Sequence, residues 1–247
     1  YTVNLMQGAS VVQSVNVTTP LASGATAQHT LSYVPATGGT FGLSGKVVLT
    51  GDGNAANDQT PVKAVFVMDD TMDMISVGND ATTTSGYYIP INLYYRNNVS
   101  EELYFTDEMH LQSGTIAAIV YKNTSTNARL GKGIKIWMAH TTATDLSGGW
   151  LPSANYTLVF DGLVDFPAGV NYIVIPLTTP FAYTGGTLAT RVYRVFDSGS
   201  ITSTEKFYYT TNAAHSTRSR YLQNDSTVYD PMAPSAAGTT LNYFPNT

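Results

Sequence analysis

Between Gly131 and Leu177 the chain passes through strand-like runs and turns without any helical periodicity. Three short strand-like runs lie at residues 134–142, 156–161 and 172–177, and a Pro-Ala-Gly turn at 167–169 separates the last two. Short runs rich in β-branched and aromatic residues and bounded by turn residues predict strands. No segment elsewhere sustains a 3.6-residue period. The chain is therefore predicted to be all-β.

Composition supports this prediction. Charged residues make up only 12% of the 247 residues, while 17 tyrosines and 21 glycines, with abundant Thr, Ser and Asn, replace them. Thr and Tyr favour pleated surfaces and Gly and Asn favour turns, whereas surface helices depend on Glu, Lys and Arg. A hydrophobic content of 43% argues against disorder.

Charge and cysteine content exclude several classes of function. The net charge is −5, and the densest basic cluster is Arg218-Ser-Arg220, so nucleic acid is not expected as a partner. No apolar stretch is long enough to span a bilayer. The absence of cysteine excludes disulfides and thiolate chemistry. The low charge content and the absence of cysteine fit an exported bacterial protein. The sequence begins at Tyr1 within a strand-like run, so we interpret it as a piece of a longer polypeptide.

The first 68 residues are predicted to form a partial β-sandwich of immunoglobulin type. Turn signals separate five expected strands, and the sandwich is expected to lack one or two strands at its start. The strands are expected at residues 1–6, 11–17, 27–34, 41–49 and 62–68.

Three pieces of this region resemble the later strands of CARDB-type immunoglobulin-like modules of large secreted Bacteroidetes proteins. They are Tyr1-Thr-Val-Asn-Leu5, Leu21-Ala-Ser-Gly-Ala25 and residues 45–58, whose Gly-Asp-x-Asn-x-x-Asn loop is the most specific part. The resemblance implies an immunoglobulin-like sandwich.

Residues 69–247 are predicted to form a jelly-roll-like β-sandwich. One helical turn is expected at residues 106–109. Ten short strands separated by Gly, Asn or Pro are expected at residues 75–79, 86–93, 102–105, 115–121, 133–139, 157–160, 172–177, 188–196, 206–209 and 218–222.

This second region resembles a recurring accessory β module of multidomain Bacteroidetes proteins, often those exported by type IX secretion. The matching pieces keep their order along the chain: 86–91, 114–119, 136–142 with Trp150, 160–162, 166–169 and 218–221. The resemblance implies a jelly-roll-like accessory domain and no catalytic residues.

No catalytic centre is predicted. The closely spaced Glu101, Glu102, Asp107 and Glu108 would serve glycoside hydrolysis only if two carboxyls faced each other across a cleft. Glu101 and Glu102 are expected at the solvated end of a strand. The four histidines are scattered, and no zinc-binding or serine-nucleophile motif occurs.

Two acidic loops are candidate calcium sites, because Asp and Asn side chains supply the oxygen ligands that Ca²⁺ requires. The alternatives are a hairpin turn and a solvated linker. The candidate ligands are Asp52, Asn54, Asn57 and Asp58 in the first loop, and Asp69, Asp70 and Asp73 at the junction of the two regions.

Aromatic side chains are the candidates for ligand binding, since exposed rings stack on the C–H faces of sugars. Trp150 follows Gly148-Gly149 and is expected to be exposed, and Tyr87 and Tyr94 belong to adjacent pairs of which one ring faces outward. Trp137 is expected in the core between the sheets. Core packing explains most tyrosines equally well.

Asp70-Thr71-Met72 resembles the O-glycosylation signal of exported Bacteroidetes proteins, which makes Thr71 a candidate modification site.

The leading hypothesis is a non-catalytic structural or adhesive section of a large secreted or cell-surface bacterial protein, acting by spacing and presentation and repeated in a fibre. Its partners would be neighbouring domains or copies of the same protein. The alternative is a carbohydrate-binding module of an exported polysaccharide-active enzyme.

Overall fold

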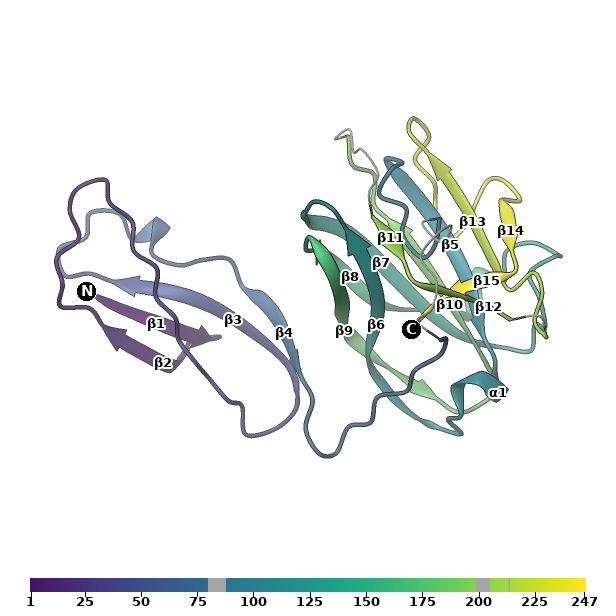
Figure 1. The fold of residues 1–247 in the computed structure, drawn as a ribbon, viewed down its shortest axis with the longest axis horizontal. Helices are drawn as coiled ribbons and strands as arrows, with labels where there is room; N and C mark the ends of the chain where they lie inside the picture. The colour runs from purple at the N-terminus through teal and green to yellow at the C-terminus, as the bar shows by residue number, and fades with distance from the viewer. Residues whose placement is uncertain (80–87, 199–204, 213) are drawn as a thin grey trace. The chain divides into compact units, whose positions relative to one another are not determined.

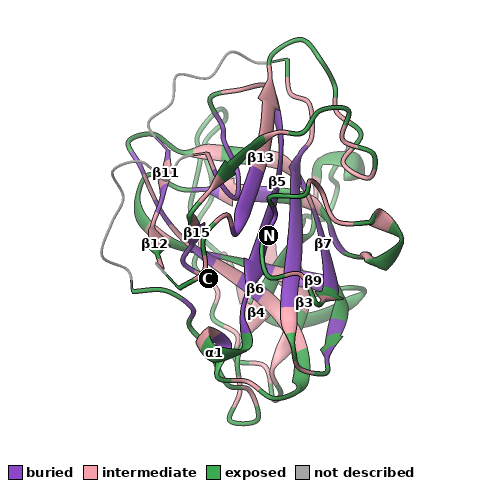
Figure 2. Ribbon diagram, turned by 90° about the vertical axis from the view of Figure 1, so that its right-hand side faces the viewer, coloured by how far each residue is buried: buried purple, intermediate pink, exposed green. Residues whose placement is uncertain are grey.

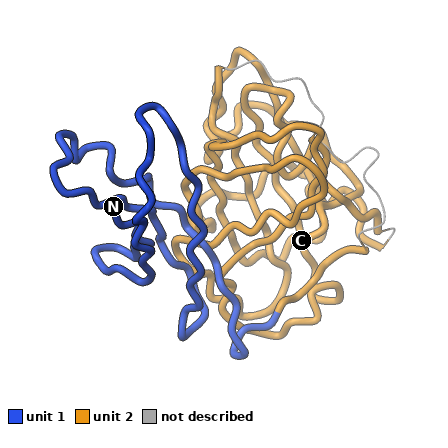
Figure 3. The backbone as a smooth tube through the Cα atoms, turned by 60° about the vertical axis from the view of Figure 1, so that its left-hand side comes forward, with its two compact units in different colours: residues 1–73 blue, residues 74–247 orange. Residues whose placement is uncertain are grey.

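The structure is a computed structural model that describes residues 1–79, 88–198, 205–212 and 214–247. The chain divides into two compact units, Tyr1–Asp73 and Met74–Thr247 (Figure 3). The predicted regions divide five residues earlier, after Met68. Each unit is described by itself below.

Unit 1 contains one antiparallel sheet, with strand order β2-β1-β3-β4 (Figure 1). Successive side chains on its strands point to opposite faces of the sheet. A bulge between Leu5 and Met6 shifts the register between β1 and β2. The strands are β1 (Thr2–Gln7), β2 (Ser10–Asn16), β3 (Gly39–Val48) and β4 (Lys63–Val67).

An irregular segment, residues 17–38, connects β2 to β3 and lies against the sheet. The Tyr1 hydroxyl hydrogen-bonds to Nε2 of His29 at 2.9 Å, and the Tyr33 hydroxyl donates to Oε1 of Gln7 at 3.2 Å. The prediction of a strand at residues 27–34 is wrong, because this stretch has no neighbouring strand to which its backbone could pair.

Unit 2 is built on a six-stranded antiparallel sheet of order β14-β13-β5-β10-β7-β8. The central strand β5 pairs with both β13 and β10, so it has neighbours on either side. The strands are β5 (Asn97–Tyr104), β7 (Arg129–Thr141), β8 (Thr157–Phe166), β10 (Thr187–Arg194), β13 (Ser219–Asn224) and β14 (Thr239–Leu241).

A second layer packs on one face of this sheet and encloses the main core. It consists of a three-stranded sheet, β11 (Lys206–Phe207), β6 (Gly114–Ser125) and β9 (Gly169–Tyr183), and a β12 (Tyr209–Thr211) and β15 (Tyr243–Pro245) pair. Figure 2 shows buried stretches along β5, β6 and β7. The core includes Tyr121, Ile136, Phe166 and Ile175, each at most 1% exposed.

The opposite face of the six-stranded sheet is covered by loops of the same chain. Two smaller apolar clusters lie there, one around Leu103 and Leu146, the other around Val99, Trp137 and Tyr193. Trp137 is buried, but the prediction that it lies between the two sheets is wrong. Its neighbours Ile136 and Met138 belong to the main core, so alternation along β7 turns Trp137 to the loop-covered face.

The predicted all-β class, with β-sandwich architecture, is confirmed, and unit 1 supplies one sheet of its predicted partial sandwich. The helical turn is α1 (Thr106–Met109), as predicted. Residues 75–79 were predicted as a strand and are not one, and β14 and β15 were not predicted. Of the predicted strand at 86–93, residues 86 and 87 lie outside the described residues, and residues 88–93 form turns, bends and irregular structure rather than a strand. In the part of the chain that the structure describes, no helix has the length and apolar character needed to cross a membrane.

Candidate functional site

A row of large side chains crosses the loop-covered face of the six-stranded sheet. Arg220 of β13 and Arg191 of β10 are both register partners of Glu101 in β5, and Arg191 is also opposite Trp137 of β7. Residues directly opposite each other in antiparallel strands share a face. The four side chains therefore form one line across four strands.

The centre of this row is an ion pair that is fully buried. Oε1 of Glu101 accepts hydrogen bonds from Nε of Arg191 at 3.0 Å and from Nη2 at 2.6 Å, and both side chains are 0% exposed. The Tyr156 hydroxyl donates to the same oxygen at 2.8 Å, and the Leu151 amide donates to Oε2 at 3.0 Å. Every oxygen of the carboxylate thus has a partner, as a buried charge requires.

Arg191 uses its remaining donors to hold two loops on the sheet. Nη1 donates to Oγ of Ser153 at 2.7 Å and to the carbonyl of Pro231 at 3.1 Å, and Nη2 donates to the carbonyl of Leu151 at 2.7 Å. The guanidinium also lies 4.4 Å from the ring centroid of Tyr156. One buried cation therefore joins loops that are about 80 residues apart in sequence.

Trp150 belongs to the same assembly. Its indole nitrogen donates to the carbonyl of Ala236 at 2.8 Å, and its ring contacts the guanidinium groups of Arg191 and Arg220 at 5.8 and 5.9 Å. Arg220 in turn donates to the carbonyls of Ala237 and Leu146. The expected exposed ring is half-buried, because these contacts draw it against the sheet.

Glu102 lies on the other side of β5 and is also fully buried. Its Oε2 accepts a hydrogen bond from Oγ1 of Thr190 at 2.8 Å. The expectation that Glu101 and Glu102 lie at a solvated strand end is wrong, because β5 is buried on both faces. The two carboxyls point to opposite faces of one sheet, so they do not face each other across a cleft as a glycosidase pair does.

Burial in the core raises the pKa of Glu102 to about 8, against the opposing hydrogen bonds of Ser100 and Thr190. The neighbouring charge of Glu101 adds to the increase. Burial likewise raises the pKa of Tyr104, whose hydroxyl bonds to Oγ1 of Thr247 at 2.7 Å. Glu102 is therefore a carboxyl group that the fold favours in its neutral form.

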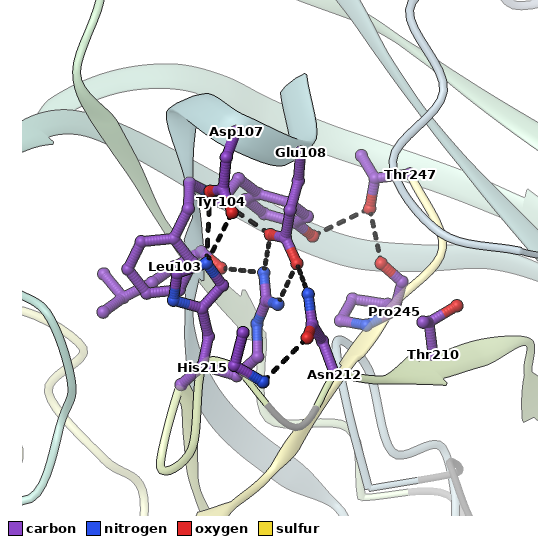
Figure 4. Close-up of polar contacts among 12 residues, drawn as sticks. Leu103, Tyr104, Asp107, Glu108, Thr210, Asn212, His215, Pro245 and Thr247 are labelled. Atoms are coloured by element: carbon purple, nitrogen blue, oxygen red, sulfur yellow. Dashed lines mark hydrogen bonds and ion pairs between the residues drawn. The ribbon is translucent and has the colours of Figure 1, made fainter. Parts of the chain in front are cut away.

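A second polar cluster lies where α1 meets the start of β13 (Figure 4). Arg218 donates to both oxygens of Glu108, at 2.6 and 2.5 Å, and to the carbonyl of Leu103 at 2.7 Å. Its guanidinium lies 3.7 Å from the ring centroid of Phe244. Burial opposes ionisation of Glu108, but the hydrogen bonds from Arg218 and Asn212 outweigh it and lower the pKa of Glu108.

Asp107 and His215 form the exposed edge of this cluster. Nε2 of His215 lies 3.0 and 3.1 Å from the two oxygens of Asp107, and the hydrogen bond lowers the pKa of Asp107. The imidazole stacks on Phe105 with a centroid distance of 3.8 Å. An Asp–His pair activates a nucleophile when one lies within hydrogen-bond reach of the ring. Among the described residues, no hydroxyl hydrogen-bonds to His215.

The other predicted binding residues are separated. Tyr94 is 51% exposed and lies edge-on to Tyr95 at 5.1 Å. Tyr87 lies outside the described residues. Trp150 is held on the loop-covered face. Sugar binding by these rings stays a prediction.

The acidic loops of unit 1 use their oxygens locally. Asp52 and Asp58 hydrogen-bond to each other, which lowers the pKa of Asp52 and raises that of Asp58. Asn54 caps a short 3₁₀ turn that contains Asn57. No group of three or more His, Cys, Asp or Glu side chains in the described ranges is arranged to hold a metal ion.

At the junction, Asp69 accepts hydrogen bonds from the Gly38 amide at 2.5 Å and from the Thr71 amide and hydroxyl at 2.9 and 2.6 Å. These bonds lower the pKa of Asp69, the one from the Thr71 hydroxyl most. Asp70 and Asp73 follow in the same exposed stretch, and Thr71 is exposed. Calcium binding and modification of Thr71 stay predictions.

The residues that sequence reasoning missed are Arg191, Arg218 and Arg220. Each is at most 3% exposed. A usable signal was present, since Arg191 interrupts the apolar run Leu188-Ala-Thr-Arg-Val-Tyr193 in a chain with few charges. An arginine at such a position is buried only when it is paired.

Comparison with known proteins gives little further guidance. No protein-family model and no curated protein matches the chain. A solved structure of the cysteine protease and lectin-like domains of Cwp84, a surface layer associated protein of Clostridium difficile, aligns at a TM-score of 0.31 with 13% identity over 62% of this chain. A structure of clostridial Cwp84 after propeptide cleavage aligns at 0.32 with 14% identity, again over 62%. The chain covers 32% and 36% of those two chains, so it spans about a third of their length.

Glu102 predicts a specific pH dependence of stability. The folded chain keeps this carboxyl protonated up to about pH 8, whereas the unfolded chain releases the proton near the ordinary value of 4.5. Between these two pH values the folded state binds more protons than the unfolded state. The contribution of Glu102 to the free energy of unfolding is therefore fully present below pH 4.5 and is lost as the pH rises to 8. From pH 5.5 to 7.5 the wild type should lose roughly 2–3 kcal/mol of unfolding free energy relative to Glu102→Gln, at about 1.4 kcal/mol per pH unit.

Urea denaturation at several pH values measures this difference, because other titrating groups are common to both proteins. Parallel stability profiles for the wild type and Glu102→Gln would contradict the assignment.

Proposed function

We propose that the chain is a non-catalytic structural or adhesive section of a secreted or cell-surface bacterial protein, acting by spacing and presentation. The observation that carries the proposal is the use of the buried charges of unit 2. Glu101, Arg191, Glu108 and Arg218 each bind strands or loops of the same chain. A catalytic group needs free access to a substrate, and these groups lack it.

The covering of the large sheet supports the same role. Loops around Leu151 and Met232 close the face on which a jelly roll could otherwise bind a ligand, with Oγ of Ser153 donating to the carbonyl of Met232. The central strands β5 and β10 of the sheet thereby have both faces buried by the same chain. A domain whose sheet is already covered on both faces is rigid without a bound partner, so unit 2 can transmit force by itself.

The proposal predicts that unit 2 resists force as one cooperative body. In single-molecule stretching of the chain within a polyprotein, Met74–Thr247 should unfold in one step that adds about 60 nm, from roughly 3.6 Å per extended residue. Cooperative unfolding is the expected behaviour of a single core with one buried network.

Unit 1 is the internal reference in the same traces, since its single sheet should open at lower force. Stepwise unfolding of unit 2 in several short extensions at low force would argue against a spacer.

A second candidate is carbohydrate binding, favoured by an exposed aromatic surface on the outer face of the three-stranded sheet. Tyr172 is 64% exposed and lies opposite Lys122 of β6. The Lys122 ammonium lies 5.3 Å from the ring centroid of Tyr172 and 4.5 Å from that of Tyr208. An exposed tyrosine ring offers an apolar face to a sugar, and an ammonium offers hydrogen-bond donors to its hydroxyls.

Affinity electrophoresis in gels containing single polysaccharides tests this candidate. If it holds, the wild type is retarded, Tyr172→Ala migrates as in an empty gel, and Leu163→Ala, which removes an exposed aliphatic side chain, stays retarded. Free migration of the wild type in every polysaccharide would remove the candidate.

A further inference from the structure

Unit 1 buries very little apolar surface. In Tyr1–Asp73, all of which the structure describes, Met6 is the one buried hydrophobic side chain. Val47, Leu49, Leu21 and Val34 are 38, 54, 48 and 89% exposed. A β-sheet is stable when its apolar face packs against another layer. Covering these exposed apolar side chains with a further layer would therefore stabilise unit 1.

Residues 27–35 are positioned to belong to that layer. His29, Leu31, Tyr33 and Pro35 are partly covered, whereas the residues between them are exposed, so the segment is extended with alternate side chains toward the sheet. Its attachment consists of the Tyr1–His29 and Tyr33–Gln7 hydrogen bonds.

The backbone of this segment has no partner strand. Within unit 1, no amide or carbonyl group of residues 27–37 makes a hydrogen bond to another backbone group. An extended segment with unpaired donors and acceptors adds a neighbouring strand readily. A hollow of about 720 Å³ lies beside it, lined by Val3, Val17, Leu21, Val47 and Leu49 among others, and gives room for apolar side chains.

The same region has no acidic, lysine or arginine side chains. The first 45 residues contain no Asp, Glu, Lys or Arg, although the chain as a whole has 29 such residues. Exposed edges in soluble proteins are usually protected by charged side chains or by proline within the strand. Here the prolines lie at Pro20, before the segment, and at Pro35, its last residue, so none interrupts residues 27–34.

We propose that residues 27–35 pair with the same segment of a second copy of this chain, as an antiparallel two-stranded ribbon centred on Leu31. In this register the sheet-facing residues match, with His29 opposite the second copy's Tyr33 and Leu31 opposite Leu31. Such a contact is self-complementary and has two-fold symmetry. The lack of charge favours a second copy, because two identical surfaces here do not repel each other. This inference specifies the partner within the structural role proposed above and rests on that role.

Sedimentation equilibrium of the full chain between about 1 and 200 µM tests the pairing. The expected result is a concentration-dependent dimer with twice the 26.5 kDa mass of the chain. Ser32→Pro removes one amide donor from the exposed segment and should weaken association at least tenfold. Ser32→Thr, which keeps the amide and favours strands, should dimerise like the wild type. A monomer at all concentrations, or equal dimerisation of Ser32→Pro, would overturn the proposal.

Because the chain lacks cysteine, a single introduced thiol reports the register. Leu31→Cys should form a disulfide-linked dimer under mild oxidation, since residues at the two-fold axis lie within disulfide reach. Ser14→Cys, an exposed position on β2, is the control and should remain monomeric. Equal cross-linking at the two positions would exclude this register. Stretching of unit 2 does not involve residues 27–35, so failure of this inference and failure of the proposed function are distinguishable.

Discussion

The ion pair between Glu101 and Arg191 is the interaction on which unit 2 depends. Both side chains are fully buried, and burying two charges is favourable only when their geometry and remaining hydrogen bonds compensate for lost solvation. Here Tyr156, Leu151, Ser153 and Pro231 supply those bonds. The pair therefore fixes more than two strands. It specifies where the loops before β8 and after β13 must lie on the sheet.

This arrangement explains why the chemically suggestive residues of the chain do not assemble a reactive centre. Along β5 the side chains alternate, so Glu101 faces the loops and Glu102 faces the core. Arg218 neutralises Glu108 at the end of the same strand. Unit 1 lacks any comparable network and leaves its apolar face and one extended segment open. The two units thus differ in how completely their own chain covers their apolar surfaces and pairs their polar groups.

Much of the fold could be predicted from the sequence, because period-two alternation and turn residues determine strands locally. Prediction failed where the outcome depends on contacts distant in sequence. Residues 27–34 have strand alternation but no neighbouring strand, and Trp137 faces the loop layer because loops, not a sheet, cover it. The burial of Glu101 and Glu102 was missed because charged side chains on a strand usually indicate a solvated position. The sequence does not show that both faces of this strand are covered. The row of arginines could be predicted only from the register of the strands, which places Arg220, Glu101 and Arg191 opposite one another on three neighbouring strands.

The unfolding free energy of Glu101→Gln, compared with Asp161→Asn, tests this account most directly. Asp161 forms an exposed ion pair with Lys135, and losing it should cost less than about 1 kcal/mol. Glu101→Gln leaves Arg191 buried without its counter-charge, and the account predicts a loss of about 3–5 kcal/mol. A loss no larger than that of Asp161→Asn would contradict the claim that the buried ion pair organises unit 2.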